Sequence, residues 1–199
     1  ADVERREFAH DCIGIGHDDV CIVECNWGYT IESDPAIKVC KQGVLKNTGM
    51  PVCNANPCTL NYPSGLGVTH NCNGTRTDAT CTAECGLPGY GYASGEVPQE
   101  FNCTWTTELA GTNPVCDALP CETLSLPAEY RVDACEGKVF GENCLVDCAD
   151  GYALQSTAKI YTCEADGSFS GTPPTCEAKP CTSGWPPDAD QNSMGCESL

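Results

Sequence analysis

The sequence predicts a small all-β, disulfide-rich fold, arranged as an elongated tandem array of similar modules. Three observations support this prediction. Cysteine accounts for 19 of the 199 residues, a density typical of disulfide scaffolds. The spacing of these cysteines repeats along the chain. Short alternating segments such as 159–163, bounded by glycine and proline, indicate strands, and no window shows a sustained helical period.

The cysteine spacing defines the repeat. From Cys58 to Cys121 the intervals are 13, 8, 3, 17, 12 and 4 residues, and from Cys121 to Cys181 they are 13, 8, 3, 14, 12 and 4. The cysteines from Cys12 to Cys58 show intervals of 8, 3, 14, 12 and 4, as in a repeat without its first cysteine. The predicted modules are therefore 1–57, 58–120 and 121–180, and 181–199 is expected to begin a further module.

Residues other than cysteine keep the same register. A Gly-Tyr pair follows the fourth cysteine position of each repeat, at 28–29, 89–90 and 151–152. A proline precedes each new repeat, at Pro57, Pro120 and Pro180. Because proline restricts its own backbone and that of the preceding residue, such short connectors are expected to allow little hinge motion, which favours a semi-rigid rod.

Composition and charge exclude several classes of protein. Ten basic residues against 28 acidic ones give a net charge of -18, which excludes a general binder of nucleic-acid phosphates. No apolar run is long enough to cross a membrane. So many paired thiols require an oxidising compartment, so we expect a secreted, extracellular or cell-surface protein. No initiator methionine precedes Ala1, so we expect a processed form or a piece of a longer protein.

Catalysis and metal binding have little support in the sequence. No Ser, His and Asp arrangement recurs, and the cysteines are assigned to bridges, so no enzyme is expected. Zinc is disfavoured because CxxC pairs are absent and only three histidines occur. The segment from Asp188 resembles the start of a calcium loop but carries Ser193 and Leu199 at its glycine and glutamate positions. We therefore expect no cofactor, with calcium there as the alternative, and we interpret 17–19 as a solvated turn.

The third repeat shows a recognisable order of motifs. Gly151-Tyr152 follows Cys148, Tyr161 precedes Cys163 by two residues, Phe169 follows Gly167, and Pro174 precedes Cys176. This order resembles the sushi domain, also called the complement control protein (CCP) module, and the resemblance extends over nearly the whole chain. The sequence departs from that family by an extra cysteine pair in each repeat and by Phe169 at the position of a tryptophan.

The resemblance implies a disulfide pattern, whereas the order of the cysteines alone leaves the pairing open. The sushi pairing joins the first family cysteine to the third and the second to the fourth, and the extra cysteines then pair locally. The implied disulfides are Cys58–Cys103, Cys121–Cys163, Cys25–Cys53, Cys85–Cys116, Cys148–Cys176, Cys12–Cys21, Cys72–Cys81 and Cys135–Cys144.

Cys40, Cys181 and Cys196 remain outside this pattern, and three alternatives are open. The chain is a piece of a longer array that holds the missing partners. Alternatively, Cys181 of one chain forms an intermolecular disulfide with Cys40 of the next, which is a head-to-tail contact. A third arrangement pairs Cys181 with Cys196 and leaves Cys40 free. Two glycosylation sequons, at Asn73 and Asn102, are expected to carry glycans in an extracellular protein.

Two functions compete at this level. The first is a non-enzymatic structural protein, a segment or subunit of an extracellular fibre, coat or surface appendage that associates head to tail or continues a longer array. The alternative, which the sushi resemblance implies, is an ectodomain fragment of an adhesion or recognition receptor that binds a protein or glycan. Aromatic residues such as Tyr90, Tyr92 and Trp105 suit either function. The position of both chain ends inside modules and the short connectors favour the structural hypothesis.

Overall fold

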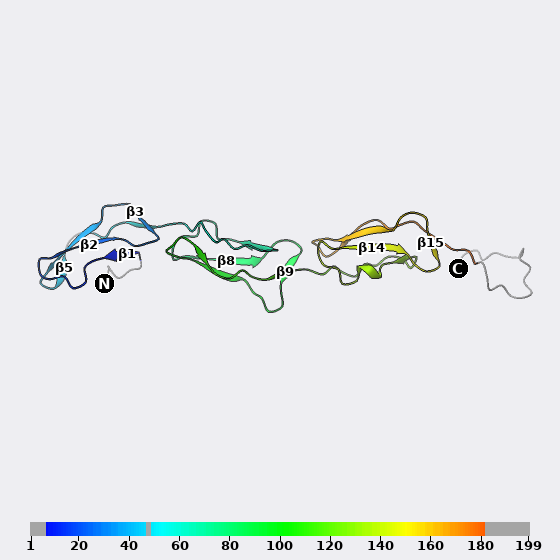
Figure 1. Cartoon of the computed structure of the whole chain (residues 1–199), viewed down its shortest axis with the longest axis horizontal. Coiled ribbons are helices and arrows are strands. Elements are labelled where there is room, and N and C mark those ends of the chain that lie inside the picture. The colour runs from blue at the N-terminus through cyan, green and yellow to red at the C-terminus, as the bar shows by residue number, and fades with distance from the viewer. Residues whose placement is uncertain (1–6, 47–48, 182–199) are drawn as a thin grey trace, which may run out of the picture. The chain divides into compact units, whose positions relative to one another are not determined.

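The structure is a computed structural model, and it describes residues 7–46 and 49–181. These residues form three tandem β modules (Figure 1). By its packing, the chain divides into two compact units, Ala1–Asp117 and Ala118–Leu199. The first unit holds two modules and the second unit holds the third.

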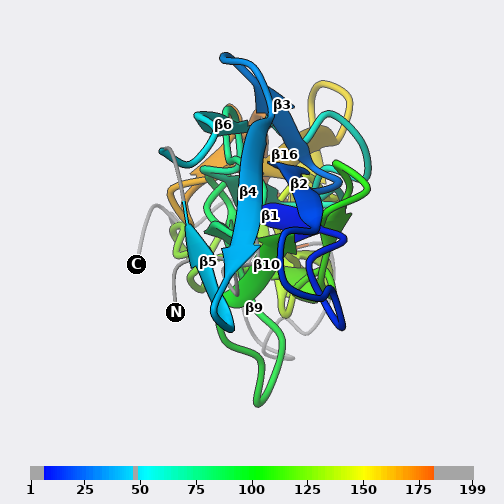
Figure 2. The same ribbon diagram turned by 90° about the vertical axis from the view of Figure 1, so that its left-hand side faces the viewer.

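The first module contains a four-stranded antiparallel sheet and a two-stranded one. The larger sheet has the order β1-β2-β4-β5, with β4 between β2 and β5 (Figure 2). The smaller sheet pairs β3 with β6. The strands are β1 Phe8–His10, β2 Val20–Cys25, β3 Tyr29–Ile31, β4 Ala36–Lys41, β5 Val44–Lys46 and β6 Cys53–Ala55.

The second module repeats this topology. Its four-stranded sheet has the order β11-β10-β8-β7, and β12 pairs with β9 in the smaller sheet. The strands are β7 Val68–His70, β8 Thr80–Cys85, β9 Tyr90–Tyr92, β10 Gln99–Cys103, β11 Leu109–Ala110 and β12 Cys116–Ala118.

The third module has the order β13-β14-β16-β17, with β15 paired to β18. A short 3-10 helix precedes its central strand. No helix in the described part of the chain has the length and apolarity needed to cross a membrane. The elements are β13 Tyr130–Arg131, η1 Asp133–Cys135, β14 Asn143–Cys148, β15 Tyr152–Leu154, β16 Lys159–Cys163, β17 Phe169–Ser170 and β18 Cys176–Ala178.

The central strand of each module forms because its side chains alternate between the core and the surface. In β2, β8 and β14 the second and fourth residues are buried and the residues on either side of them are more exposed. The buried pairs are Cys21 and Val23, Cys81 and Ala83, and Cys144 and Val146. Half-cystines and small aliphatic residues therefore supply much of each core, so the modules depend on disulfides for stability.

Eight disulfides hold the described residues together, and they fall into three kinds. The first kind is local, with a sequence separation of 9, and fastens the start of each central strand: Cys12–Cys21, Cys72–Cys81 and Cys135–Cys144. The second kind joins the end of the central strand to the last strand: Cys25–Cys53, Cys85–Cys116 and Cys148–Cys176. The third kind closes the longest loops: Cys58–Cys103 and Cys121–Cys163.

An aromatic side chain completes the core of the second and third modules. Phe101 and Tyr161 are each 4% exposed and lie two residues before the cysteine that ends β10 or β16. Glycine packs directly on each ring. A Cβ atom on Gly171 would lie 2.5 Å from Cγ of Tyr161, and one on Gly111 would lie 2.7 Å from Cγ of Phe101. These two positions therefore require glycine for space.

Candidate functional site

The two glycosylation candidates both have exposed side chains. Asn73 lies in a turn with Gly74, before β8. Asn102 lies on β10, where it pairs with Thr80 of β8 and Ala110 of β11. The threonine of its sequon, Thr104, donates a hydrogen bond from Oγ1 to the backbone oxygen of Glu108 at 3.0 Å. Glycosylation of both asparagines remains a prediction.

Among the described cysteines, Cys40 and Cys181 form no disulfide. Cys40 lies on β4 and is only 7% exposed, whereas Cys181 is exposed. Cys196 lies outside the described residues. An intermolecular bond between Cys40 and Cys181 remains a prediction, and the burial of Cys40 means that the first module would have to open to form it.

The metal candidates do not form a donor set in the described residues. The one group of possible ligands there is Asp11, Cys12 and Cys21, but the two cysteines are joined as a disulfide and offer no thiolate. In the turn 17–19, Asp18 forms an ion pair with Lys41, and Asp19 Oδ2 accepts a hydrogen bond from the backbone N–H of Gly16 at 2.7 Å. The calcium-like segment from Asp188 lies outside the described residues.

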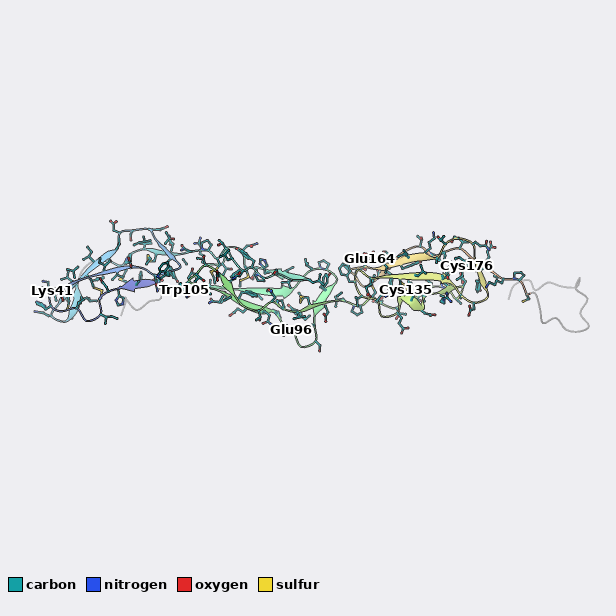
Figure 3. All side chains as sticks on the ribbon, viewed as in Figure 1. Lys41, Glu96, Trp105, Cys135, Glu164 and Cys176 are labelled. Atoms are coloured by element: carbon teal, nitrogen blue, oxygen red, sulfur yellow. A yellow bond between two sulfur atoms is a disulfide. The ribbon has the colours of Figure 1, made fainter. Side chains whose placement is uncertain are left out.

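The exposed aromatic residues of the second module lie in two separate places. Tyr90 and Tyr92 belong to β9, which pairs with β12. Trp105 lies in the turn between β10 and β11 at the other end of the module (Figures 1 and 3). They therefore do not form one cluster, and Trp105 instead shares a hollow with residues of the first module.

Within the first compact unit, hydrogen bonds fasten the first module to the second. Thr77 is 5% exposed, and its Oγ1 donates to the backbone oxygen of Gly28 at 2.8 Å. The backbone N–H of Asn56, in the connector, donates to the same oxygen at 2.8 Å, and the N–H of Thr77 donates to Asn56 O at 2.9 Å. The hydroxyl of Tyr29 donates to Asp78 Oδ2 at 2.9 Å. Side chains and connector together therefore fix this junction.

Gly28 allows the two modules to approach closely. Its φ is +84°, a region that favours glycine. A Cβ atom there would lie 2.8 Å from Cγ2 of Thr77 and 2.9 Å from the Cα atom of Trp105. The Gly-Tyr motif at this position thus serves both the turn before β3 and the contact with the second module.

A surface hollow of about 470 Å³ opens at this junction, and we call it the junction hollow. The exposed fractions of Trp27 and Trp105 are 78% and 62%, so both indoles are accessible. The second-module side of the hollow is held by Cys103, because the N–H of Asp78 donates to Cys103 O at 2.9 Å. The lining residues are Asn26, Trp27, Tyr29, Thr77, Asp78 and Trp105.

Three lining residues of the junction hollow have different residues at the corresponding positions of the third module. Trp105 lies two residues after the fifth cysteine position, where the third module has Ala165, and Asp78 lies where the third module has Gly141. Trp27 lies two residues after the fourth position, where the third module has Asp150. The core of the third module is therefore built without these three side chains.

Comparison with known proteins shows which family the third module matches. The family model of the sushi repeat (SCR repeat) matches residues 121–176. The two preceding modules repeat the strand order of that region, together with its local and fourth-to-sixth disulfides. Residues 121–176 therefore form a sushi repeat, and the two preceding modules share its architecture. Because these repeats are disulfide-rich, they indicate an extracellular location.

Selectins are among the curated proteins that are similar to this chain. E-selectin of Bos taurus is 28% identical over 162 residues, which cover 77% of this chain and 32% of the relative. E-selectin of Sus scrofa is 28% identical over 171 residues, with 83% and 34% covered, and P-selectin of Rattus norvegicus is 28% identical over 160 residues, with 77% and 20% covered. The chain thus spans about a third or less of these relatives. The similarity supports a recognition protein better than the structural subunit that the sequence favoured.

Proposed function

We propose that this chain is a non-catalytic section of an extracellular adhesion or recognition protein, whose sushi repeats present binding surfaces to a macromolecular partner. The observation that carries the proposal is the pair of exposed tryptophans at the junction hollow, Trp27 and Trp105. Tryptophan is enriched among the residues that dominate binding energy, and exposed apolar surface of this kind marks interaction sites.

The geometry of the junction supports the same function. Hydrogen bonds of Thr77 and Tyr29 join the two modules on either side of the hollow. A partner that binds across this junction meets a surface that is already ordered, so it loses less conformational entropy on binding. The burial of Cys40 supports recognition over covalent polymerisation, because Cys181 of another chain reaches that sulfur only if the first module opens.

Adhesion of the displayed chain tests the proposal. Beads that carry the oxidised chain at high density are expected to adhere to at least one surface in a panel of cells and extracellular-matrix proteins, since dense display multiplies weak contacts. Beads that carry the same chain after reduction and alkylation are the control. The proposal fails if native beads bind no surface better than the control. Non-reducing gels with a ladder that collapses to 21.0 kDa on reduction would then favour the structural alternative.

A further inference from the structure

The junction hollow combines two exposed indoles with a carboxylate. Trp27 comes from the turn between β2 and β3, and Trp105 from the turn between β10 and β11. Asp78 lines the same hollow, and the hydroxyl of Tyr29 holds its Oδ2 at 2.9 Å. A carboxylate accepts several hydrogen bonds, so Asp78 can bind Tyr29 and a ligand donor at the same time.

This combination is suited to a positively charged group. The faces of tryptophan and tyrosine rings carry negative electrostatic potential and attract ammonium and guanidinium groups, with tryptophan the strongest. A nearby carboxylate adds a direct charge interaction and a hydrogen-bond acceptor. Apolar ligands alone would leave Asp78 without a charge partner in the hollow.

The charge around the hollow favours the same kind of ligand. Glu24 lines the neighbouring depression that contains Trp27, and Glu108 lines the one that contains Trp105. The nearby cation Arg76 donates from Nη1 to the backbone oxygen of Ala55 at 2.7 Å and does not line the hollow. With a net charge of -18 on the whole chain, the long-range field attracts a basic partner and speeds its association.

We propose that the junction hollow binds an arginine or lysine side chain of a basic protein partner, with the charged group over Trp27 or Trp105 and hydrogen-bonded to Asp78. This inference rests on the proposed recognition function and names the chemistry of its partner. Arginine is expected to bind better than lysine, because its planar guanidinium stacks on an indole and also donates to a carboxylate.

Asp78→Asn is the most informative substitution. The backbone of Asp78 has φ 65°, and asparagine tolerates this left-handed region. The amide oxygen can still accept the hydrogen bond from Tyr29, so the variant removes mainly the charge. The matched control is Glu96→Gln, which also removes one negative charge but lies on the loop between β9 and β10, apart from Trp105 (Figure 3).

The test titrates the full oxidised chain with a tetra-arginine peptide at physiological ionic strength and follows the heat of binding. Asp78→Asn is expected to weaken binding about tenfold, and Trp27→Ala or Trp105→Ala about fivefold each. Glu96→Gln is expected to change the affinity by less than about twofold, as a remote screened charge. A tetra-lysine peptide is expected to bind more weakly than tetra-arginine.

Several results would overturn the inference. Equal effects of Asp78→Asn and Glu96→Gln would mean that the peptide responds to overall charge, and unchanged binding by both tryptophan variants would exclude the hollow. Binding of a neutral oligosaccharide in place of tetra-arginine, with loss in the tryptophan variants, would assign the hollow to a glycan. Bead adhesion separates the failure of this inference from the failure of the proposed function. If wild-type beads and Trp27→Ala/Trp105→Ala beads adhere equally well, only the binding role of the junction hollow is rejected. If wild-type beads do not adhere, the proposed function itself is rejected.

Discussion

The first module and the two that follow build the same sheet from different interior residues. The strand that ends at the fifth cysteine position is β4 in the first module, β10 in the second and β16 in the third. Cys103 and Cys163 are fully buried in disulfides, whereas Cys40 at the same position is buried without one among the described residues. The four-stranded order is nevertheless the same in all three.

The core beneath this strand also differs between the first module and the other two. Two residues before the cysteine, the second and third modules have the buried rings of Phe101 and Tyr161, and the first module has the partly exposed Lys38. Strand pairing in this fold therefore follows from the alternating pattern and from the two other disulfides, Cys12–Cys21 and Cys25–Cys53. The first-to-fifth bridge and the aromatic ring add stability to a topology already specified.

The largest expected effect comes from removing this bridge in the third module. Cys121→Ala together with Cys163→Ala opens a loop with a sequence separation of 42, and the chain-entropy model predicts a loss of about 4 kcal/mol in local stability. Hydrogen exchange of the β16 amides measures this loss. Cys40→Ala is the control, with an expected loss of about 1 kcal/mol in β4 because only packing changes. Similar losses in the two variants would contradict the role given to the bridge.

The next effect concerns the glycines that pack on the aromatic rings. Gly171→Ala places a Cβ atom 2.5 Å from Cγ of Tyr161, and this overpacking is expected to cost about 1–3 kcal/mol in the third module. Gly49→Ala is the control, because no described residue apart from its chain neighbours has an atom within 4 Å of the added Cβ. Denaturant unfolding compares the two. A Gly171→Ala protein as stable as the control would show that Tyr161 moves aside freely.

A smaller effect on stability is expected from a rise in pH. It is expected in the third module, which has Tyr161 in its core, and not in the second, which has Phe101 there. Burial, together with the nearby Tyr130, raises the pKa of Tyr161 above its usual value of 10.0. The folded module thus keeps this proton at a pH where the unfolded chain loses it. The resulting stability is complete below about pH 10 and is lost as pH rises through the folded pKa.

Tyr161→Phe tests this pH dependence directly. The variant is expected to keep its stability where the wild type loses it, since phenylalanine fills the equivalent core position in the second module as Phe101. Denaturant midpoints measured below and above pH 10 make the comparison, and a parallel decline in both proteins would show that other groups cause the loss.

The sequence carried more information about the modules than about the candidate site. Cysteine spacing locates the strands. The fourth cysteine position ends β2, β8 and β14 in the three modules, and the fifth ends β10 and β16 in the two complete repeats. The junction hollow was not predicted, because Trp27 and Trp105 are distant in sequence and line one hollow only when the first and second modules are joined. The usable signal was a tryptophan at a register position that the third repeat fills with Ala165.

Thiol labelling is expected to have the smallest effect on the fold. It tests directly whether Cys40 and Cys181 carry free thiols. Cys181 is exposed and is expected to react with an alkylating reagent in the native protein, whereas Cys40, at 7% exposure, is expected to react only after denaturation. Mass spectrometry of the labelled peptides distinguishes the two. If Cys181 instead resists labelling, and non-reducing gels show multimers that Cys181→Ser and Cys40→Ser each abolish, then the head-to-tail bond to Cys40 exists. The first module then acquires a fifth-position bridge from another chain.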